Sequence, residues 1–240
     1  MIRARLKRRA QKESKGADLS QRLITLLEPS SKASEAYRTL RTNLLYSYVD
    51  LPLKVIALTS HSSAEGKSTT CANLGVVLAQ AEKRTLIVDC DLRRPVLHKV
   101  FGLRNLRGIV NFLAGEYSLQ EVWQQTPLRH LTVLTVGPIP PNPAELLSSK
   151  RFAEFVGQVR QEFDYVLLDA PPVYLFSDAA ILATQADGTL IVLDAQSTRK
   201  AAIRQVVRSL NTVGANILGT VMNNVEASKG DYYYSSYTQG

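Results

Sequence analysis

Short apolar runs alternate with longer segments of mixed polarity along most of the chain. From residue 54 onward, six of these runs have the length and the aliphatic, β-branched composition of strands that are buried on both faces. They are Val55–Ser60, Thr85–Cys90, Leu131–Val136, Tyr165–Ala170, Gly188–Asp194 and Ile217–Met222. The hydrophobic pattern therefore predicts a sheet of buried strands.

Helical spacing is found between these runs. After the first run, apolar residues recur at i, i+3, i+4 and i+7, at Leu74, Val77, Leu78 and Ala81. A further helix is expected over Arg199–Val213, because Gly214 follows it and glycine is typical of helix ends. Strands that alternate with helices predict an α/β fold, with a mostly parallel sheet covered by helices on both faces.

Another helix is predicted before the first strand, over Ser34–Tyr46. Its apolar residues share one narrow arc, at Tyr37, Leu40 and Leu44, and its charged residues Glu35, Arg38 and Arg41 share the opposite side. Two arginines and a carboxylate off the packing face would suit contact with a neighbouring subunit. The alternative is a solvated charged face.

Composition fits a folded, soluble domain. The chain has 240 residues, of which 45% are hydrophobic and 21% charged. No apolar run approaches the ~20 residues that cross a bilayer, and no apolar stretch follows the basic start as in a secretory signal. Cys71 and Cys90 fall in apolar segments without metal-type spacing, which indicates inert core thiols in a reducing compartment. We therefore expect a cytoplasmic protein.

The net charge of +8 is concentrated at the N-terminus. Residues 1–16 hold seven basic residues and one acid, so the rest of the chain is close to neutral and offers no basic face for a specific nucleic acid. The basic arm would suit an anionic membrane surface or nucleic acid, and a solvated tail is the alternative. We divide the chain into an arm and linker (1–33), a folded domain (34–230) and a tail (231–240).

The segment between the first strand and the next helix has the residues of a phosphate-binding loop. Glu65-Gly66-Lys67-Ser68-Thr69 opens the helix after a loop of small residues. In such a loop backbone N–H groups face the phosphates, Lys67 reaches the β and γ oxygens, and Ser68 offers its hydroxyl to Mg²⁺. His61 stands where the general motif has glycine, and an ordinary strand-to-helix turn is the alternative.

Three acids are expected at the same edge of the sheet, because they follow strands that end there. Asp89 and Asp91 close the second strand and Asp169 closes the strand over Tyr165–Ala170. A lone aspartate after a strand is usually a turn or cap, but three beside a Gly-Lys-Ser loop indicate a Mg²⁺ site. We place Asp89 near the metal and Asp91 toward an acceptor as base, with the reverse assignment left open.

Together these motifs resemble the bacterial tyrosine kinases, which work with polysaccharide co-polymerases in capsule and exopolysaccharide export. The resemblance runs from Ser34 to the C-terminus. It rests on Glu35-x-x-Arg38-x-x-Arg41, TSHSSAEGKST, LIVDCDLRRP, GPIPPNPAELL (Gly137–Leu147), YVLLDAPPV and a C-terminal tyrosine cluster.

The resemblance implies a P-loop NTPase three-layer sandwich that binds ATP and Mg²⁺. It implies catalytic roles for Lys67, Asp89 and Asp91 and metal contacts from Ser68, Asp89 and Asp169. The nucleotide would be held by Ala64, Glu65, Gly66, Lys67, Ser68 and Thr69. The resemblance also implies a ring-shaped homo-oligomer built through Glu35, Arg38 and Arg41. Autophosphorylation is expected in trans, on Tyr232, Tyr233, Tyr234 and Tyr237. The implied partner is a membrane polysaccharide co-polymerase that activates the kinase and recruits it to the inner face of the membrane.

One departure in the loop and two competing functions go with this interpretation. Family loops carry Pro-Gly where this chain has Ser63-Ala64, and the methyl of Ala64 would crowd a backbone that the family keeps bare. Partition and division-site ATPases share the fold, but their loop carries an extra lysine where this chain has Ser62. A nucleotide-binding regulatory scaffold without kinase activity is the other alternative, and the Ala64 departure keeps it open.

Overall fold

The structure is a computed structural model, and it describes residues 19–46 and 53–226. Its sheet has seven strands in the order β3-β4-β2-β5-β1-β6-β7. Their bounds are β1 Val55–Ser60, β2 Thr85–Asp89, β3 Trp123–Gln125, β4 Leu131–Leu134, β5 Tyr165–Asp169, β6 Gly188–Asp194 and β7 Ile217–Asn223. All six predicted strands are present, and every pairing among them is parallel.

One strand, β3, is missing from the sequence prediction. It is only three residues long, pairs antiparallel with β4 and forms the edge of the sheet. Its Trp-Gln-Gln sequence has neither a buried aliphatic run nor a clear alternation, so the hydrophobic pattern carries no signal for it.

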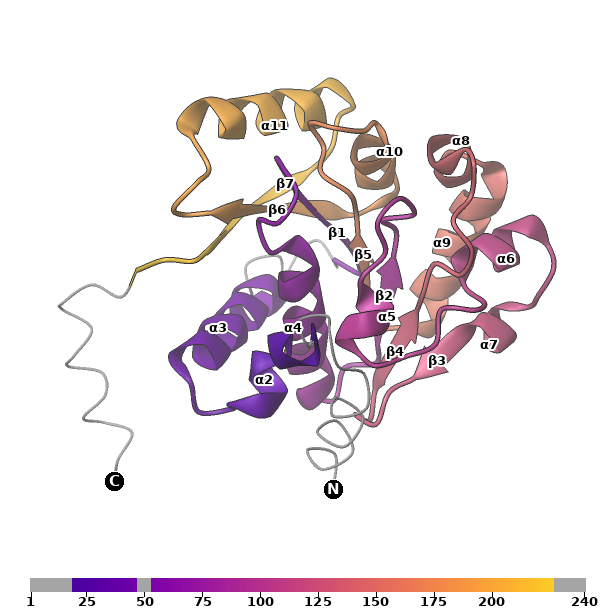
Figure 1. Cartoon of the computed structure of the whole chain (residues 1–240), viewed down its shortest axis with the longest axis horizontal. Coiled ribbons are helices and arrows are strands. Elements are labelled where there is room, and N and C mark those ends of the chain that lie inside the picture. The colour runs from indigo at the N-terminus through magenta and orange to yellow at the C-terminus, as the bar shows by residue number, and fades with distance from the viewer. Residues whose placement is uncertain (1–18, 47–52, 227–240) are drawn as a thin grey trace.

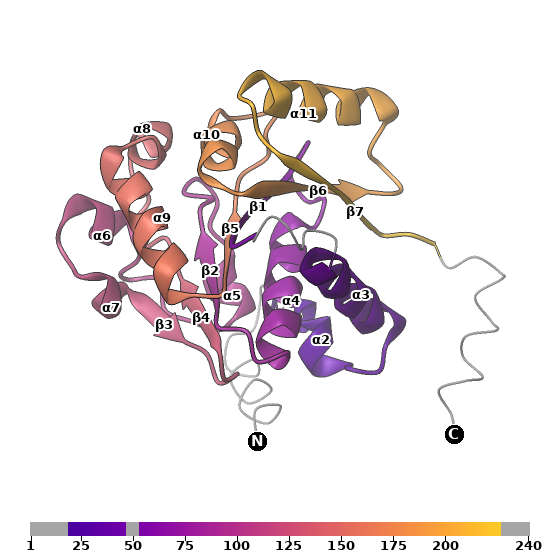
Figure 2. The ribbon, with the colours of Figure 1, turned by 180° about the vertical axis from the view of Figure 1, so that it is seen from behind.

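Helices cover both faces of the sheet and complete a three-layer sandwich, as predicted (Figures 1 and 2). On one face lie η1 Leu19–Arg22, α2 Ile24–Leu27, α3 Lys32–Tyr46, α4 Lys67–Gln80 and α5 Leu97–Val100. On the other lie α6 Ile109–Ala114, α7 Leu119–Val122, α8 Pro143–Leu147, α9 Lys150–Glu162, α10 Asp178–Gln185 and α11 Lys200–Thr212. Successive strand residues alternate between the two hydrophobic cores: Ala57 packs into the second group of helices, and Leu58 into the first.

Helix α4 lies between the sheet and a further layer formed by α2 and α3. It is buried on nearly all sides, including Leu74, Val77 and Leu78 of the predicted apolar stripe. At Gly75 a Cβ would lie 2.4 Å from the Cδ1 of Ile87, so α4 packs against β2 more closely than any larger residue would permit. This packing fixes the helix that begins at the phosphate loop.

The packed part of the chain begins earlier than the predicted domain boundary at residue 34. Leu23 is 1% exposed, and the Thr25 hydroxyl donates to the Oδ1 of Asn73 on α4 at 2.8 Å. Residues 23–27 therefore belong to the folded body rather than to a linker. The basic residues of positions 1–16 and the tail tyrosines lie outside the described residues.

Helix α3 presents the three charged residues proposed for an interface, but they are not equally available. Glu35 is exposed and pairs with Arg38 at 2.5 Å, and Arg38 also donates to the carbonyl of Pro29. Arg41 instead turns back to donate to the Val77 carbonyl of α4 at 3.1 Å. The expectation that Arg41 lies off the packing face therefore needs correction, while a subunit contact through this helix stays a prediction.

Cys71 and Cys90 are free and buried, as the sequence predicted. Burial raises the pKa of both thiols well above the usual value, and the nearby carboxylates add to the effect. Within the described ranges, no helix combines the length and apolar character needed to cross a membrane.

Candidate active site

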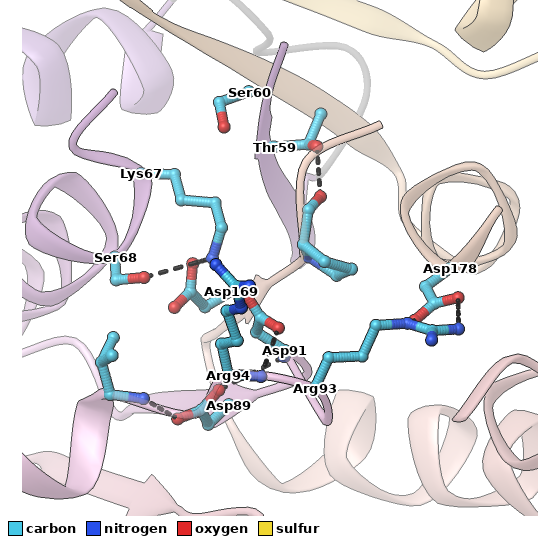
Figure 3. A network of polar contacts seen from close by, with 12 residues as sticks. Thr59, Ser60, Lys67, Ser68, Asp89, Asp91, Arg93, Arg94, Asp169 and Asp178 are labelled. Carbon is cyan, nitrogen blue, oxygen red and sulfur yellow. Dashed lines mark hydrogen bonds and ion pairs between the residues drawn. The ribbon is translucent and has the colours of Figure 1, made fainter. Parts of the chain in front are cut away.

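The predicted phosphate loop and the predicted acids meet where β1, β2 and β5 end (Figure 3). The central position of β1 beside β5, with β2 on the far side of β5, brings three strand ends to one edge of the sheet. Residues 61–66 form the loop that leads from β1 into α4. The unpaired N–H groups of the first turn of α4, including those of Ser68 and Thr69, give this edge a partial positive charge.

Two residues of the loop have left-handed backbone conformations. Gly66 has φ +91°, and a Cβ there would lie 2.2 Å from the Nδ2 of Asn223, so glycine is required. Ala64 has φ +67°, a conformation in which an L-residue is strained. The departure from Pro-Gly therefore leaves the loop in a glycine-like shape, at a conformational cost of roughly 1–2 kcal/mol.

Side chains from distant parts of the sequence hold the loop in place. The Glu65 carboxylate accepts hydrogen bonds from the Ser62 backbone N–H at 2.9 Å and from the Thr198 hydroxyl at 2.6 Å. The Asn223 amide donates to the Glu65 backbone carbonyl at 2.9 Å. The Glu65 side chain is thus engaged in shaping the loop, and a nucleotide contact by Glu65 stays a prediction. At the start of the loop, the His61 ring stacks on the Tyr174 ring, with ring centroids 4.7 Å apart.

Lys67 lies at the centre of the site, facing two of the three predicted acids. Its Nζ is 3.1 Å from the Oδ2 of Asp91 and 3.2 Å from the Oδ1 of Asp169, and it also donates to the Ser68 hydroxyl at 3.2 Å. Figure 3 shows the ammonium group and both carboxylates pointing toward one another from α4, the β2 exit and the β5 exit. The Lys67 ammonium group therefore contacts carboxylates whose place a phosphate group could take. A metal ion could bridge the carboxylates to that phosphate.

Asp89 occupies a different environment from Asp91. It is fully buried, and its Oδ2 accepts from the backbone N–H groups of Val96 and Leu97 at 3.2 and 3.1 Å. Its Oδ1 accepts from the Asp91 N–H at 3.3 Å. Asp89 thus holds the start of α5 and the turn that carries Asp91, whereas Asp91 contacts Lys67 directly.

Burial governs the protonation of these groups. Desolvation raises the pKa of Asp169, against the opposing effects of Lys67 and the neighbouring Ser68 hydroxyl. Burial, followed by repulsion from Asp169, raises the pKa of Asp89 well above its usual value. Burial alone would lower the pKa of Lys67, but attraction by Asp169, Asp91 and Asp89 outweighs it and raises that pKa. The site therefore favours a charged Lys67 and disfavours accumulated negative charge.

An ion pair between a half-buried arginine and a fully buried aspartate links the loops that follow β2 and β5. The Arg93 guanidinium donates to both oxygens of Asp178, from Nε at 2.8 Å and from Nη2 at 3.1 Å. Its Cζ lies 4.2 Å from the ring centre of Phe176, in a cation–π contact. Asp178 is fully buried, so this pair ties the Asp91-bearing turn to the start of α10.

The oxygen atoms at this edge fit a Mg²⁺ ion that a bound nucleotide would share. No described residue donates a hydrogen bond to the buried Oδ2 of Asp169. The Ser68 hydroxyl on α4 lies near enough to the same carboxyl group to lower its pKa. In the described ranges no cluster of three or more His, Cys, Asp or Glu residues could hold a metal alone. A magnesium ion at Ser68 and Asp169 would therefore need water and phosphate oxygens, the arrangement that Mg²⁺ prefers.

The structure thus gathers Lys67, Ser68, Asp89, Asp91 and Asp169 at one edge, although Asp89 faces α5. Sequence reasoning missed Asn223, Thr198 and Asp178. Each is far along the chain from its partner and lies in a segment without a phosphate-binding motif, so only the strand order brings it near the loop.

Comparisons of the sequence and the fold with known proteins show which proteins this chain is similar to. Residues 53–223 match the family model described as AAA domain. The chain is 41% identical over 224 residues to tyrosine-protein kinase YwqD of Bacillus subtilis (strain 168), which covers 93% of this chain and 94% of that protein. It is 33% identical over 210 residues to tyrosine-protein kinase CpsD of Streptococcus agalactiae, which covers 86% of this chain and 91% of that protein.

A longer relative matches over a part of its length. Tyrosine-protein kinase wzc of Salmonella typhi is 32% identical over 218 residues, which is 90% of this chain and 30% of that protein. Among solved structures, the chimerical protein CapA2B2 superimposes with a TM-score of 0.83 and 34% identity, over 86% of this chain and 91% of that one. The septum site-determining protein MinD of Pyrococcus horikoshii OT3 has a TM-score of 0.62 and 23% identity over 73% of this chain and 72% of that one, a likeness of fold alone.

Proposed function

Because this chain belongs to the bacterial tyrosine kinases, we propose that it transfers the γ-phosphoryl group of ATP to tyrosines in the C-terminal tail of a second copy. Membership of this family makes the chain a nucleotide-binding protein-tyrosine kinase. We propose the tail tyrosines as acceptors, transfer between two copies, and Mg²⁺ as the metal. The observation that carries it is the placement of Lys67 against Asp91 and Asp169 at the N-terminus of α4.

Nucleotide binding would rearrange the charges around Lys67. We expect the β and γ phosphates to lie along residues 64–69, where backbone N–H groups and the helix dipole favour negative charge. Lys67 would then exchange its contacts with the two carboxylates for phosphate oxygens. Mg²⁺, held through Ser68 and Asp169, supplies charge neutralisation and orients the phosphates when bound.

The acceptor hydroxyl needs a carboxylate nearby to take its proton, because a phenol has a pKa of about 10. Asp91 is the better candidate for that base, since Asp89 already accepts three backbone hydrogen bonds. Asp89 would then keep the Asp91 turn and α5 in position. The metal contact first proposed for Asp89 stays a proposal that a substitution must test.

Transfer between copies would link activity to assembly. The tail carries Tyr232, Tyr233, Tyr234 and Tyr237, and each phosphorylation adds about −1.5 to −2 charges. We propose that the copies associate through α3, and that a membrane polysaccharide co-polymerase activates them and recruits them to the membrane during capsule or exopolysaccharide synthesis.

A plain ATPase of the partition and division-site type is the second candidate, because MinD shares the fold. Ser62 at the position of that group's extra lysine argues against it. A nucleotide-binding scaffold without transfer is the third, and the strained Ala64 is the observation in its favour.

A mixing experiment tests transfer between copies. The Lys67→Met variant keeps its tyrosines but lacks the phosphate-binding ammonium, so it should accept and not donate. A variant with Phe at positions 232, 233, 234 and 237 should donate and not accept. Neither should become phosphorylated alone with Mg-ATP, and the mixture should carry phosphotyrosine on the Lys67→Met chain. A silent mixture, beside an active unaltered protein, would restrict transfer to a single chain.

A further inference from the structure

Helix α11 carries a row of positive charge on its exposed side. Lys200, Arg204 and Arg208 recur every four residues and therefore share one stripe of the helix, and Arg199 directly precedes its first residue. All four side chains belong to exposed residues, and the sequence of α11 contains no acid. Within the described part of the chain, none of the four takes part in an ion pair. The near-neutral sum of the folded body thus conceals one basic surface.

Exposed apolar side chains lie beside this basic row. The loop between β5 and α10 presents Tyr174, which is 59% exposed, and Leu175, which is 50% exposed. Both line a hollow of about 410 Å³ whose wall also includes Ser209 and Thr212 of α11. Thr212 lies one helical turn after Arg208, so the hollow borders the basic row. We call this surface the α11 face, and it consists of Arg199, Lys200, Arg204, Arg208, Tyr174, Leu175 and the hollow.

The α11 face is separate from the helix proposed for assembly. Helix α11 packs on the face of the sheet opposite to α3, and Figures 1 and 2 show it along the outside of the molecule with α10 beside it. Its apolar side is anchored, because Val206 and Leu210 are buried in the core under the helix. Contact with a partner through the charged side of α11 would therefore leave both the fold and α3 undisturbed.

Two contacts connect the α11 face to the phosphate loop. The His61 ring stacks on the Tyr174 ring, and His61 Nε2 lies 3.2 Å from the Oε1 of Gln205 on α11. The start of the phosphate loop is therefore in direct contact with the residues of this surface. A partner bound to the α11 face would lie next to the nucleotide site without occupying it.

Cations beside exposed apolar side chains fit the surface of an anionic bilayer. A lysine or arginine close to such a surface strengthens binding about fivefold. Tyrosine rings favour the headgroup level, and an exposed leucine adds apolar area that enters the interface. The hollow offers room for part of a lipid beside the basic row. A nucleic acid would use the same cations but would leave Leu175 and the hollow without a role.

We propose that the α11 face binds directly to the anionic lipid surface of a bilayer, with headgroups on the basic row and Leu175 in the interface. The inference does not depend on the proposed kinase function. It goes beyond recruitment by a membrane protein, because the lipid itself is the partner. It also differs from a membrane contact through the basic residues of positions 1–16, since the folded domain supplies the surface.

Flotation of the full chain with vesicles tests the proposal. We expect the chain to bind vesicles of phosphatidylcholine mixed with phosphatidylglycerol but not vesicles of phosphatidylcholine alone, and to bind less tightly as salt is added. The triple variant Lys200→Gln, Arg204→Gln, Arg208→Gln should lower the partition coefficient roughly a hundredfold, at about fivefold for each cation. The matched control removes the same charge from exposed positions away from α11, and it should leave the partition coefficient nearly unchanged. It combines Lys83→Gln, Lys99→Gln and Arg129→Gln.

Leu175→Ser separates the apolar contribution from the charge. It should weaken binding about fivefold at every salt concentration, since part of the apolar area that enters the interface is lost. The triple variant should instead flatten the dependence on salt. Leu175 is preferred to Tyr174 because Tyr174 also contacts the phosphate loop. The substituted residues are exposed, so coincident thermal unfolding curves should show that every variant keeps the fold.

Several outcomes would overturn the proposal. They are no binding of the unaltered chain to the anionic vesicles at low salt, and unchanged binding in the triple variant. Binding that is lost only when the basic residues of positions 1–16 are replaced by glutamine would assign the contact to the arm. A triple variant that loses affinity for duplex DNA but keeps its affinity for the vesicles would assign the basic row to nucleic acid. The assay contains no ATP, so its result is independent of the kinase function.

Discussion

At the scale of single residues, Ala64 is the position of the phosphate loop where a non-glycine residue has a strained backbone. It adopts the left-handed conformation, φ +67°, that glycine would adopt without strain. We expect Ala64→Gly to raise the free energy of unfolding by about 0.5–1 kcal/mol in urea titrations, and to tighten Mg-ATP binding in calorimetry.

Glu82→Gly is the matched control for that prediction. Glu82 is also left-handed, with φ +59°, but it lies in the turn after α4, at the far end of the helix from the phosphate loop. It should gain similar stability with no change in nucleotide affinity. A loss of stability in Ala64→Gly would show that the alanine is accommodated without strain.

The raised pKa of Asp169 predicts a pH dependence for metal binding. Because the folded-state pKa lies above that of the unfolded chain, the proton on Asp169 stabilises the nucleotide-free protein at low pH, and this stabilisation is lost as the pH rises through the folded pKa. Mg²⁺ needs the ionised form, so Mg-ATP affinity should rise with pH through the same range and binding should release a proton. Calorimetry in buffers of different ionisation enthalpy, at pH values from about 4, the ordinary pKa of aspartate, upward, measures both.

Asp169→Asn provides the comparison for the pH profile. It should bind Mg-ATP more weakly at every pH and with a flatter dependence. An unaltered profile in this variant would assign the titration to Asp89 or to the nucleotide itself.

The central residues of the site were predictable because their signals are local. Lys67 and Ser68 follow a small-residue loop, and Asp89, Asp91 and Asp169 each follow an apolar strand. The orientation of Asp89 toward α5 was not predictable, since α5 is a four-residue helix without periodicity. Nor was the Asn223 contact, which depends on β7 lying beside β6 and close to the loop.

At the scale of elements, the buried strands were predicted best. The bounds of β1 and β6 match the apolar runs, because almost every position in both strands faces a hydrophobic core. The strand β3 and the short helices were missed, since three to six residues carry too little periodicity to recognise. Helix α2 was missed for the same reason, although its neighbour Leu23 is as buried as the central strands.

The ion pair of Arg93 and Asp178 connects two of these elements and predicts a separable effect on catalysis. Arg93→Met should destabilise the protein by roughly 2–3 kcal/mol, because it leaves the fully buried Asp178 carboxylate unpaired while the guanidinium it removes was partly solvated. It should also lower kcat for tyrosine phosphorylation with little change in KM for ATP, since the turn bearing Asp91 loses its anchor.

The double variant Arg93→Met with Asp178→Leu tests whether the pair positions the site or only stabilises it. An apolar pair of similar size should restore most of the unfolding free energy in denaturant titrations. If the pair positions Asp91, kcat should stay low despite that recovery. Recovery of kcat together with stability would reduce the ion pair to a structural role.

At the scale of the whole molecule, assembly should depend on α3 but not on all three of its charged residues equally. Glu35 and Arg38 pair on the exposed side, whereas Arg41 is engaged with the Val77 carbonyl. Single exposed ion pairs contribute only ~0–1 kcal/mol, so an effect on assembly must come from repetition around a closed ring. We expect the double variant Glu35→Ala, Arg38→Ala to shift the particle toward monomer in light scattering. Arg41→Ala alone should shift it in the same direction and should also lower the free energy of unfolding.

A protein that is monomeric at every concentration, with or without an activating membrane-protein fragment, would contradict the ring.

The central claim is that the Lys67 site transfers phosphate to the tail tyrosines rather than to water. The most direct test is mass spectrometry of the tail after the full chain is incubated with Mg-ATP, with and without an activating membrane-protein fragment, while ATP hydrolysis is followed in parallel. We predict phosphotyrosine confined largely to Tyr232, Tyr233, Tyr234 and Tyr237, and none in Lys67→Met. Hydrolysis of ATP with no modified tyrosine under either condition would contradict the kinase and leave a plain ATPase.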